Sequence, residues 1–381
     1  NVLEGFTGSA NASVGTSAWH LFRRYRGGLS LNFRNNKVNV FSNFSYNYKE
    51  SLSRNYNYRS TFLPTDTSFM EQFNNSTRIR NGGMARIGMD YYFDDYNTLT
   101  VAARLRPSGG GNRNSVEYNF MDANEVKTDI SERLNNGVRN RFSMTYNVIY
   151  SKVFKQKKKK KDDPGRRKDN SEDAFAKNHK SWRGQGDGRA AGRSGTMGDK
   201  QELVIDLQYS GNDNKGNETF VEQLYFADWT EQNINPDSQF VQTDNDMHQG
   251  TVRIDYTHPI NPSVKIEAGY KGNIRWMGNQ LNAENYDFSL NTMVNDSNRT
   301  NNFEFLEQVH AIYLTFAHKV GKLRYKLGIR GEYTLANSRL VSPNDSTFVN
   351  NYPSIFPTAN LSYELPKNQQ LQLGFSRRIK R

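Results

Sequence analysis

Hydrophobic and polar residues alternate without a break in the segment 323–333. One face collects apolar side chains and the other collects charged ones: Leu323, Tyr325, Leu327, Ile329 and Tyr333 against Arg324, Lys326, Arg330 and Glu332. Because a β-strand turns successive side chains to opposite faces, this pattern predicts a strand with one apolar face and one wet face.

Segments of the same kind recur along the whole chain and predict about thirteen strands. Their apolar alternation centres on residues 6–14, 29–33, 38–48, 85–93, 99–105, 142–150, 203–209, 252–256, 264–270, 312–316, 323–333, 359–363 and 371–375. A sequence of such strands with no helical pattern between them indicates an all-β protein.

The predicted connections alternate between short and long. Short ones lie near 35–37, 94–97, 259–262, 319–321 and 366–369, and long polar ones near 49–80, 107–138, 212–248, 274–306 and 336–354. Transmembrane β-barrels of outer membranes have short periplasmic turns and longer extracellular loops. We therefore expect an antiparallel meander that forms a transmembrane barrel in a Gram-negative outer membrane, with odd strands running outward. A soluble sandwich or propeller also alternates its faces, but its inward faces would not carry charge this densely.

The composition fits a barrel better than a soluble domain. Mean hydropathy is −0.87 and only 35% of the 381 residues are hydrophobic, yet the chain contains 21 Tyr and 23 Phe. A barrel with a polar lumen and aromatic girdles reconciles these values. No apolar run approaches the roughly 18 residues of a spanning helix, and no signal peptide precedes the first strand. We expect the chain to be part of a longer protein. Cysteine is absent, so a thiolate metal site and disulfides are excluded.

One connection departs from the alternation. A short turn is expected between Tyr150 and Leu203, but the segment 155–200 is a low-complexity insert with fifteen Lys and Arg and seven Asp and Glu. Its net charge of +8 accounts for most of the +12 of the whole chain. We therefore divide the chain into barrel strands 1–154, a disordered basic insert 155–200, and barrel strands 201–381 that continue past the chain end.

The basic run of the insert has three readings. Its candidate polyanion contacts are Lys157, Lys158, Lys159, Lys160, Lys161, Arg166 and Arg167. A solvated insertion without a partner is the favoured reading, and contact with anionic lipid is the alternative. Nucleic acid is not expected as a partner, because only Phe175 and Trp182 offer stacking rings and no nucleic-acid fold surrounds them.

Several segments resemble a known family. Phe6-Thr7-Gly8-Ser9-Ala10 and Tyr25-Arg26-Gly27-Gly28-Leu29-Ser30-Leu31-Asn32-Phe33-Arg34 are similar to the first two barrel strands of TonB-dependent outer-membrane receptors, in the outer-membrane β-barrel family common in Bacteroidota. The segment 37–46 is similar to that family's third strand. Asn360-Leu361-Ser362-Tyr363-Glu364-Leu365 and 371–379, ending in Ser-Arg-Arg-Ile, resemble a later strand pair. The resemblance covers nearly the whole chain except the insert.

The resemblance implies a role and a missing part. Such receptors have about 22 strands around a plug, so the chain would be an incomplete barrel whose plug and TonB box lie outside it. The implied function is uptake of a scarce nutrient, such as a siderophore, an oligosaccharide or a peptide. The implied partners are outer-membrane lipid, the TonB complex through the plug, and the small-molecule or oligomeric nutrient. The alternative is a structural or assembly barrel without active transport.

No motif in the sequence indicates catalysis, a cofactor or a metal. The six histidines are scattered, and His310 and His318 are too far apart on one strand to share a metal. Asp244-Asn245-Asp246 lacks the spaced carboxylates of a calcium loop. We therefore expect a protein that is not an enzyme. Five polar-face cations are candidate lumen-facing residues, forming a positive stripe for an anionic substrate or a self-neutralised wall against a plug: Arg253, Lys265, Arg324, Lys326 and Arg330.

Overall fold

The computed structural model describes residues 4–16, 22–62, 67–154, 200–233, 235–342, 344–366 and 369–379, and every regular element in them is a β-strand. The fourteen strands are β1 (Gly5–Thr16), β2 (Phe22–Arg34), β3 (Val38–Phe62), β4 (Thr67–Asp94), β5 (Asn97–Met121), β6 (Lys127–Val153), β7 (Glu202–Phe226), β8 (Asp237–Asn261), β9 (Val264–Asp287), β10 (Thr292–Asn295), β11 (Asn301–Val320), β12 (Leu323–Ser342), β13 (Ser346–Glu364) and β14 (Gln370–Ser376). The predicted all-β class is confirmed.

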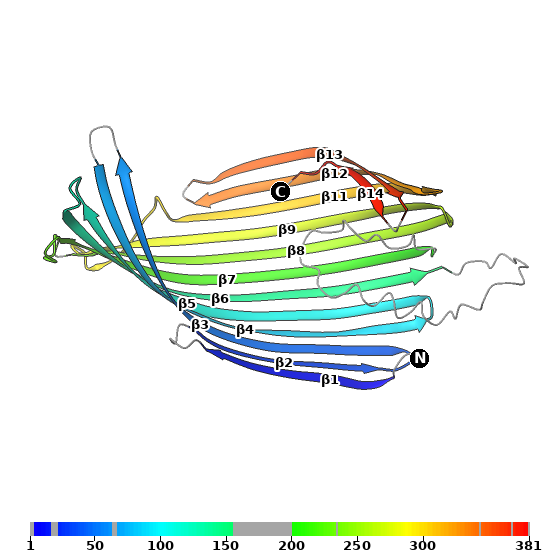
Figure 1. The fold of residues 1–381 in the computed structure, drawn as a ribbon, viewed down its shortest axis with the longest axis horizontal. Helices are drawn as coiled ribbons and strands as arrows, with labels where there is room; N and C mark the ends of the chain where they lie inside the picture. The colour runs from blue at the N-terminus through cyan, green and yellow to red at the C-terminus, as the bar shows by residue number, and fades with distance from the viewer. Residues whose placement is uncertain are drawn as a thin grey trace, which may run out of the picture.

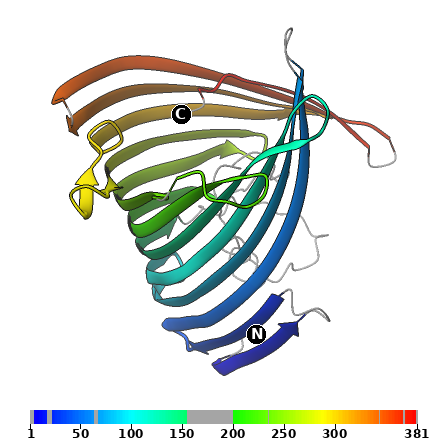
Figure 2. The same ribbon diagram turned by 90° about the vertical axis from the view of Figure 1, so that its left-hand side faces the viewer.

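The strands form one antiparallel meander, as predicted. Thirteen of them lie on a continuous path in chain order, and the short β10 pairs only with β9. β1 and β14 are the two ends of this path and do not pair with each other, so the described sheet is open. The sheet curves into a trough, with β1 along one margin and β13 along the other (Figures 1 and 2).

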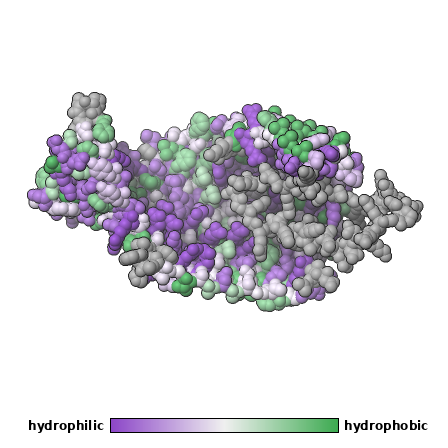
Figure 3. Space-filling view, in the orientation of Figure 1, coloured by the Kyte–Doolittle hydropathy of each residue, from purple (hydrophilic) through white to green (hydrophobic). Residues whose placement is uncertain are grey.

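Cross-strand register separates the two faces of the trough. Residues that pair across neighbouring strands share a face, and one such row runs Val40, Met89, Val101, Val148, Leu207 and Val252 from β3 to β8. These rows of exposed apolar side chains belong to the convex face. The opposite, concave face is turned to the viewer in Figure 3 and is mostly hydrophilic across the middle strands. The alternation of the sequence is thus converted into an apolar outside and a polar inside.

The expectation of long polar loops is wrong. The segments 49–80 and 107–138 are mostly paired strand, and the connections in them shrink to 63–66 and 122–126. The same holds for 212–248, 274–306 and 336–354. Both faces of these outer stretches are polar, so no apolar alternation marks them as strands. The antiparallel ladder continues there because it gives each backbone N–H and C=O a partner.

The short turns lie where the sequence predicts them, and polar side chains close two of them. The Asn35 side chain accepts bonds from the backbone N–H groups of Lys37 and Val38, at 2.9 and 2.7 Å. Asp94 accepts similarly from Tyr96 and Asn97, at 2.7 and 2.8 Å. Asn and Asp favour turns because their side chains satisfy backbone donors locally.

The two strands on either side of the insert form one hairpin. Val153 of β6 pairs with Glu202 of β7, and the Phe154 N–H donates to the Gln201 carbonyl at 2.9 Å. The insert therefore leaves and rejoins the sheet at the same end as the short turns. Residues 155–199 lie outside the described part of the chain, and so do all the candidate polyanion contacts between Lys157 and Arg167. Among the described residues, no helix is long and apolar enough to cross a membrane.

Candidate functional site

The five predicted lumen-facing cations lie on the polar concave face of β8, β9 and β12. Each of them forms an ion pair with a carboxylate of the same face. Their partners are Asp206 and Asp255 for Arg253, Glu267 for Lys265 and Lys326, Glu332 for Arg330, and Glu364 for Arg324. We call this region of β7–β13 the paired surface. Of the two arrangements expected from the sequence, a free positive stripe and a self-neutralised wall, its geometry matches the second.

Arg253 is the centre of the best connected part of the paired surface. Its guanidinium lies 3.4 Å from the Asp206 carboxylate on β7 and 3.1 Å from that of Asp255 on its own strand. The Tyr313 hydroxyl on β11 donates a hydrogen bond to Asp255. Gly269 of β9 lies between them in the same cross-strand row, and a β-carbon there would collide with the Tyr313 ring. The glycine lets the tyrosine lie across β9.

A second part of the paired surface lies nearer the short turns. Glu267 binds two lysines, Lys265 at 2.7 Å and Lys326 at 2.8 Å, from β9 and β12. Arg324 and Lys319 share Glu364 of β13, at 3.7 and 3.1 Å. Every cation of this part therefore contacts a carboxylate, and four cations share two carboxylates. Partly exposed pairs of this kind add little stability individually, but they fix the position of each side chain.

The other half of the concave face, over β2–β6, is strongly basic. We define the basic surface as nine exposed side chains on that face: Arg24, Arg26, Lys49, Arg78, Arg80, Arg104, Arg106, Arg139 and Arg141. None of the nine forms an ion pair with another described residue. In the described part of the chain, one side chain of the set forms a hydrogen bond: Arg141 Nε donates to Asn212 Oδ1, at 2.5 Å. This surface was not predicted from the sequence, although Arg104 and Arg106, on either side of Leu105, follow the period-two alternation of a strand.

Cross-strand pairing brings like charges into direct opposition on the basic surface. Arg24 pairs with Lys49, and Lys49 pairs with Arg80. The row continues through Gly110 to Arg139. The next three rows toward the short turns contain Arg26, Arg106 and Arg104. Within the described residues, these rows also lack Asp and Glu from β1 to β7. Like charges that face each other across strands destabilise a sheet, so this arrangement is unfavourable unless an anion lies against it.

Aromatic belts bound the apolar convex face. Tyr146, Tyr209, His248 and Trp276 stack in sequence from β6 to β9, and the Tyr209 hydroxyl lies 2.8 Å from His248 Nδ1. At the end of β8 near the short turns, Tyr256 stacks on His258 with centroids 6.0 Å apart. Beyond His248, on the side away from the short turns, the convex face of β8 becomes polar, with Asp246 and Asp244 as the next residues of that face.

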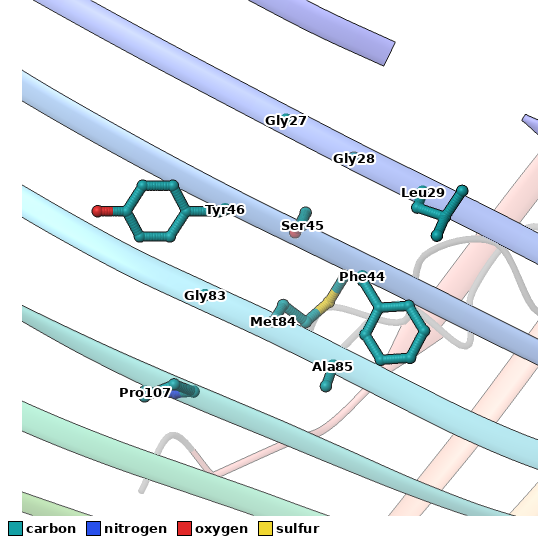
Figure 4. A pocket seen from close by; sticks show the side chains of 10 residues that line it. All are labelled: Gly27, Gly28, Leu29, Phe44, Ser45, Tyr46, Gly83, Met84, Ala85 and Pro107. Atoms are coloured by element: carbon teal, nitrogen blue, oxygen red, sulfur yellow. The ribbon is translucent and has the colours of Figure 1, made fainter. Parts of the chain in front are cut away.

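One hollow of the described chain lies on the convex face. It measures about 490 Å³ and is lined by residues of β2, β3, β4 and β5, with Leu29, Phe44 and Tyr46 beside the bare positions Gly27 and Gly83 (Figure 4). Its lining is apolar and carries no charged group. It is therefore a depression in the apolar outer surface and is separate from the charged concave face.

Each histidine of the described ranges lies beside a tyrosine hydroxyl. His310 Nδ1 lies 2.8 Å from the Tyr270 hydroxyl and His318 Nδ1 lies 2.9 Å from the Tyr325 hydroxyl, both on the convex face. Within the described ranges, no group of three or more His, Asp or Glu side chains could hold a metal ion. Asp244, in the segment that lacks the spaced carboxylates of a calcium loop, pairs with Lys215 at 2.8 Å.

Comparison with known families decides the class of the sheet. Residues 196–381 match the model of the outer membrane protein beta-barrel family. The protein is an outer-membrane β-barrel. Its location is therefore the outer membrane, and its apolar convex face contacts membrane lipid.

Solved structures give only remote likenesses to this outer-membrane barrel. They include the outer membrane protease OmpT from Escherichia coli, at 9% identity over 86% of this chain and 96% of that one, with a TM-score of 0.23. They also include the alcaligin receptor FauA from Bordetella pertussis, at 10% identity over 98% and 68%, with a TM-score of 0.16. The ferric enterobactin receptor PfeA gives 7% identity, 97% and 75% coverage and a TM-score of 0.17. Such low scores carry no argument. No curated protein matches the chain.

The dimensions of the outer-membrane barrel agree with a bilayer. From His258 to His248, the two belts of β8 are ten residues apart, which is about 33 Å along a strand and about 25 Å after a tilt near 40°. On β3 the same interval runs from Val38 to Tyr48, which contacts Tyr25 with ring centroids 5.8 Å apart. Strands of 24 to 28 residues in β3–β9 therefore extend well beyond the membrane.

Proposed function

We propose that the protein is the barrel of a TonB-dependent outer-membrane receptor that takes up a scarce nutrient. The observation that carries the proposal is the charged concave face, which is basic over β2–β6 and lined with ion pairs over β7–β13. A structural barrel needs an apolar outside, but it does not need a lumen lined by cations. The proposed role is binding and transport without catalysis.

Three further features support this role. The strand motifs around Phe6 and Asn360 resemble those of TonB-dependent receptors. The paired surface offers an ordered, ion-paired face for a plug to pack against. The tall hairpins of β3–β9 extend beyond the membrane on the side opposite the short turns, where a nutrient would first be captured.

Uptake by cells tests the proposal. Cells that carry the complete gene are compared with cells that lack it for accumulation of labelled nutrient pools, with and without a protonophore. A TonB-dependent receptor gives accumulation that needs both the gene and the proton-motive force. If loss of the gene weakens the envelope but leaves every uptake rate unchanged, the protein is instead a structural or assembly barrel.

A further inference from the structure

We propose that the basic surface on the concave face of β2–β6 binds a soluble oligoanion, a chain that carries several carboxylate or phosphate groups. This inference rests on the proposed uptake function and names the substrate class. It concerns residues that are distinct from the five lumen-facing candidates, because those five are already paired with carboxylates.

The charge balance of the two halves is the first argument. Over β7–β12, each predicted lumen-facing cation has a carboxylate within 4 Å. Over β2–β6, four successive rows present Arg24, Arg26, Lys49, Arg80 and their neighbours with no carboxylate on the same face. Acidic residues border this region on the same face: Glu218 of β7, in the row of Arg78, accepts a hydrogen bond from Asn135. Asp90 is buried and accepts hydrogen bonds from Asn39 and Thr100. An external anion is the missing counter-charge.

The second argument is the register. The row from Arg24 to Arg139 crosses four strand spacings, which is about 19 Å. Within a strand, the pairs Arg24 and Arg26, Arg104 and Arg106, and Arg139 and Arg141 place guanidinium groups on the same face about 7 Å apart. A single small anion cannot satisfy an array of this size. A chain with anionic groups at intervals of about 5–7 Å matches both spacings.

The chemistry of the side chains narrows the ligand further. Eight of the nine residues are arginines, whose planar forks bind carboxylate and phosphate with two parallel hydrogen bonds. Between them the face carries small, amide and methionine side chains, including Ser45, Asn47 and Met84. Gly110 interrupts the central row where a β-carbon would collide with the Ile79 carbonyl. The rows contain no aromatic ring, so they lack the stacking platform of a single-strand nucleic-acid site.

The position of the basic surface fits capture from outside. Arg24 and Arg26 flank Tyr25, which belongs to the aromatic pair at the membrane edge farther from the short turns. Lys49 and Arg80 lie in the same cross-strand row as Arg24, whereas Arg106 and Arg104 lie four and six residues deeper along the strands. A concave basic surface at the mouth of the barrel concentrates anions and raises their association rate at low salt.

The test measures binding to the purified full-length receptor, with its plug, by isothermal titration. The probes are oligogalacturonate and linear polyphosphate of matched length, with maltohexaose as the neutral control. The test variant Arg80→Gln/Arg139→Gln removes two charges from the central row. The matched control Arg54→Gln/Arg113→Gln removes two charges from the convex face of β3 and β5.

We expect one of the two oligoanions to bind, and the better one identifies the anionic group. Each arginine removed from the basic surface should weaken binding about tenfold, as for hydrogen bonds between charged groups. The control variant should leave affinity unchanged, and added salt should weaken binding to the wild type more than to the test variant. Removing charge relieves repulsion between neighbours, so thermal unfolding should show the test variant folded.

The inference is overturned if neither oligoanion binds, if maltohexaose binds equally well, or if both double variants behave alike. The last result would mean that the plug covers the basic surface. These outcomes are separate from failure of the proposed function. A receptor that accumulates another nutrient but binds no oligoanion keeps its transport role, whereas an oligoanion binder without gene-dependent uptake does not.

Discussion

Tyr313 of β11 reaches across Gly269 of β9 to donate its hydroxyl to Asp255 of β8. Three strands are thereby joined by side chains as well as by the backbone ladder. Arg253 and Asp206 extend the connection to β7. This link lies in the middle of the paired surface, where a plug or a substrate would pass.

Removing the Tyr313 hydroxyl should loosen this half of the barrel. We expect Tyr313→Phe to lower the free energy of unfolding by about 1–2 kcal/mol, because it deletes a hydrogen bond to a charged acceptor. Gly269→Ala should cost more, since the new β-carbon displaces the Tyr313 ring. Urea unfolding of the reconstituted protein measures both. The control is Tyr333→Phe on the convex face, which should change little; equal effects of Tyr313→Phe and Tyr333→Phe would contradict the assignment.

Labelling of single cysteines checks the two faces of β12. Leu327 is 50% exposed on the convex face, whereas Arg324 lies on the concave face beside Glu364. In the full-length protein in its membrane, Leu327→Cys should react only with a membrane-soluble maleimide. Arg324→Cys should react with an aqueous one. The reverse pattern would mean that the register of the strand is shifted by one residue.

Hydrogen exchange tests whether the polar outer hairpins are strands. The amides of residues 51–60 pair with residues 69–78 in the β3–β4 ladder. We expect these amides to exchange much more slowly than those of the connection 227–233, because most of them donate to a neighbouring strand. Exchange at the same rate in both segments would show that the sequence-based expectation of long loops is right after all.

A carboxylate pair just beyond the aromatic belt of Tyr209 and His248 should make stability depend on pH. Asp246 pairs directly with Asp213 across β7 and β8. Burial, and then the nearby charges of Asp244 and Asp213, raise the pKa of Asp246 above its ordinary value. A raised carboxyl pKa means that the folded state holds this proton more tightly than the unfolded state. Ionisation therefore costs stability as the pH rises through the folded pKa.

Asp246→Asn should consequently stabilise the protein at neutral pH, by about 0.2–1 kcal/mol as for other like-charged cross-strand pairs. The gain should fade as the pH drops toward the unfolded value of about 3.9, where the wild-type carboxyl is protonated as well. Melting temperatures at pH 7.5 and pH 4 measure the difference. A gain of the same size at both values would rule out a titrating origin.

The sequence predicted the membrane-facing part of the fold well. In segments such as Val252 to Tyr256, the alternation follows directly from the need to face lipid on one side and water on the other. The turns at Asn35 and Asp94 were predictable because side chains close them locally. The halves of β3–β9 that extend beyond the membrane were not predicted as strands, because a strand with water on both faces shows no alternation of apolar and polar side chains.

The candidate site divides in the same way. The concave position of Arg253, Lys265, Arg324, Lys326 and Arg330 follows from parity within a single strand. Three of these cations pair with a carboxylate two residues along their own strand, so part of the ion pairing also follows from a single segment. The basic surface exists only because five separate strands align in register, and it cannot be read from one segment alone.

By itself, the sequence determined that the chain folds into strands with one apolar and one polar face, because side-chain direction is fixed residue by residue along a strand. The tertiary structure decided which charges meet. Arg24, Lys49 and Arg80 are tens of residues apart in the chain, and only the meander places them opposite one another. Electrostatic energy depends on distance in space, so the basic half of the lumen could be set only by the register of the folded sheet.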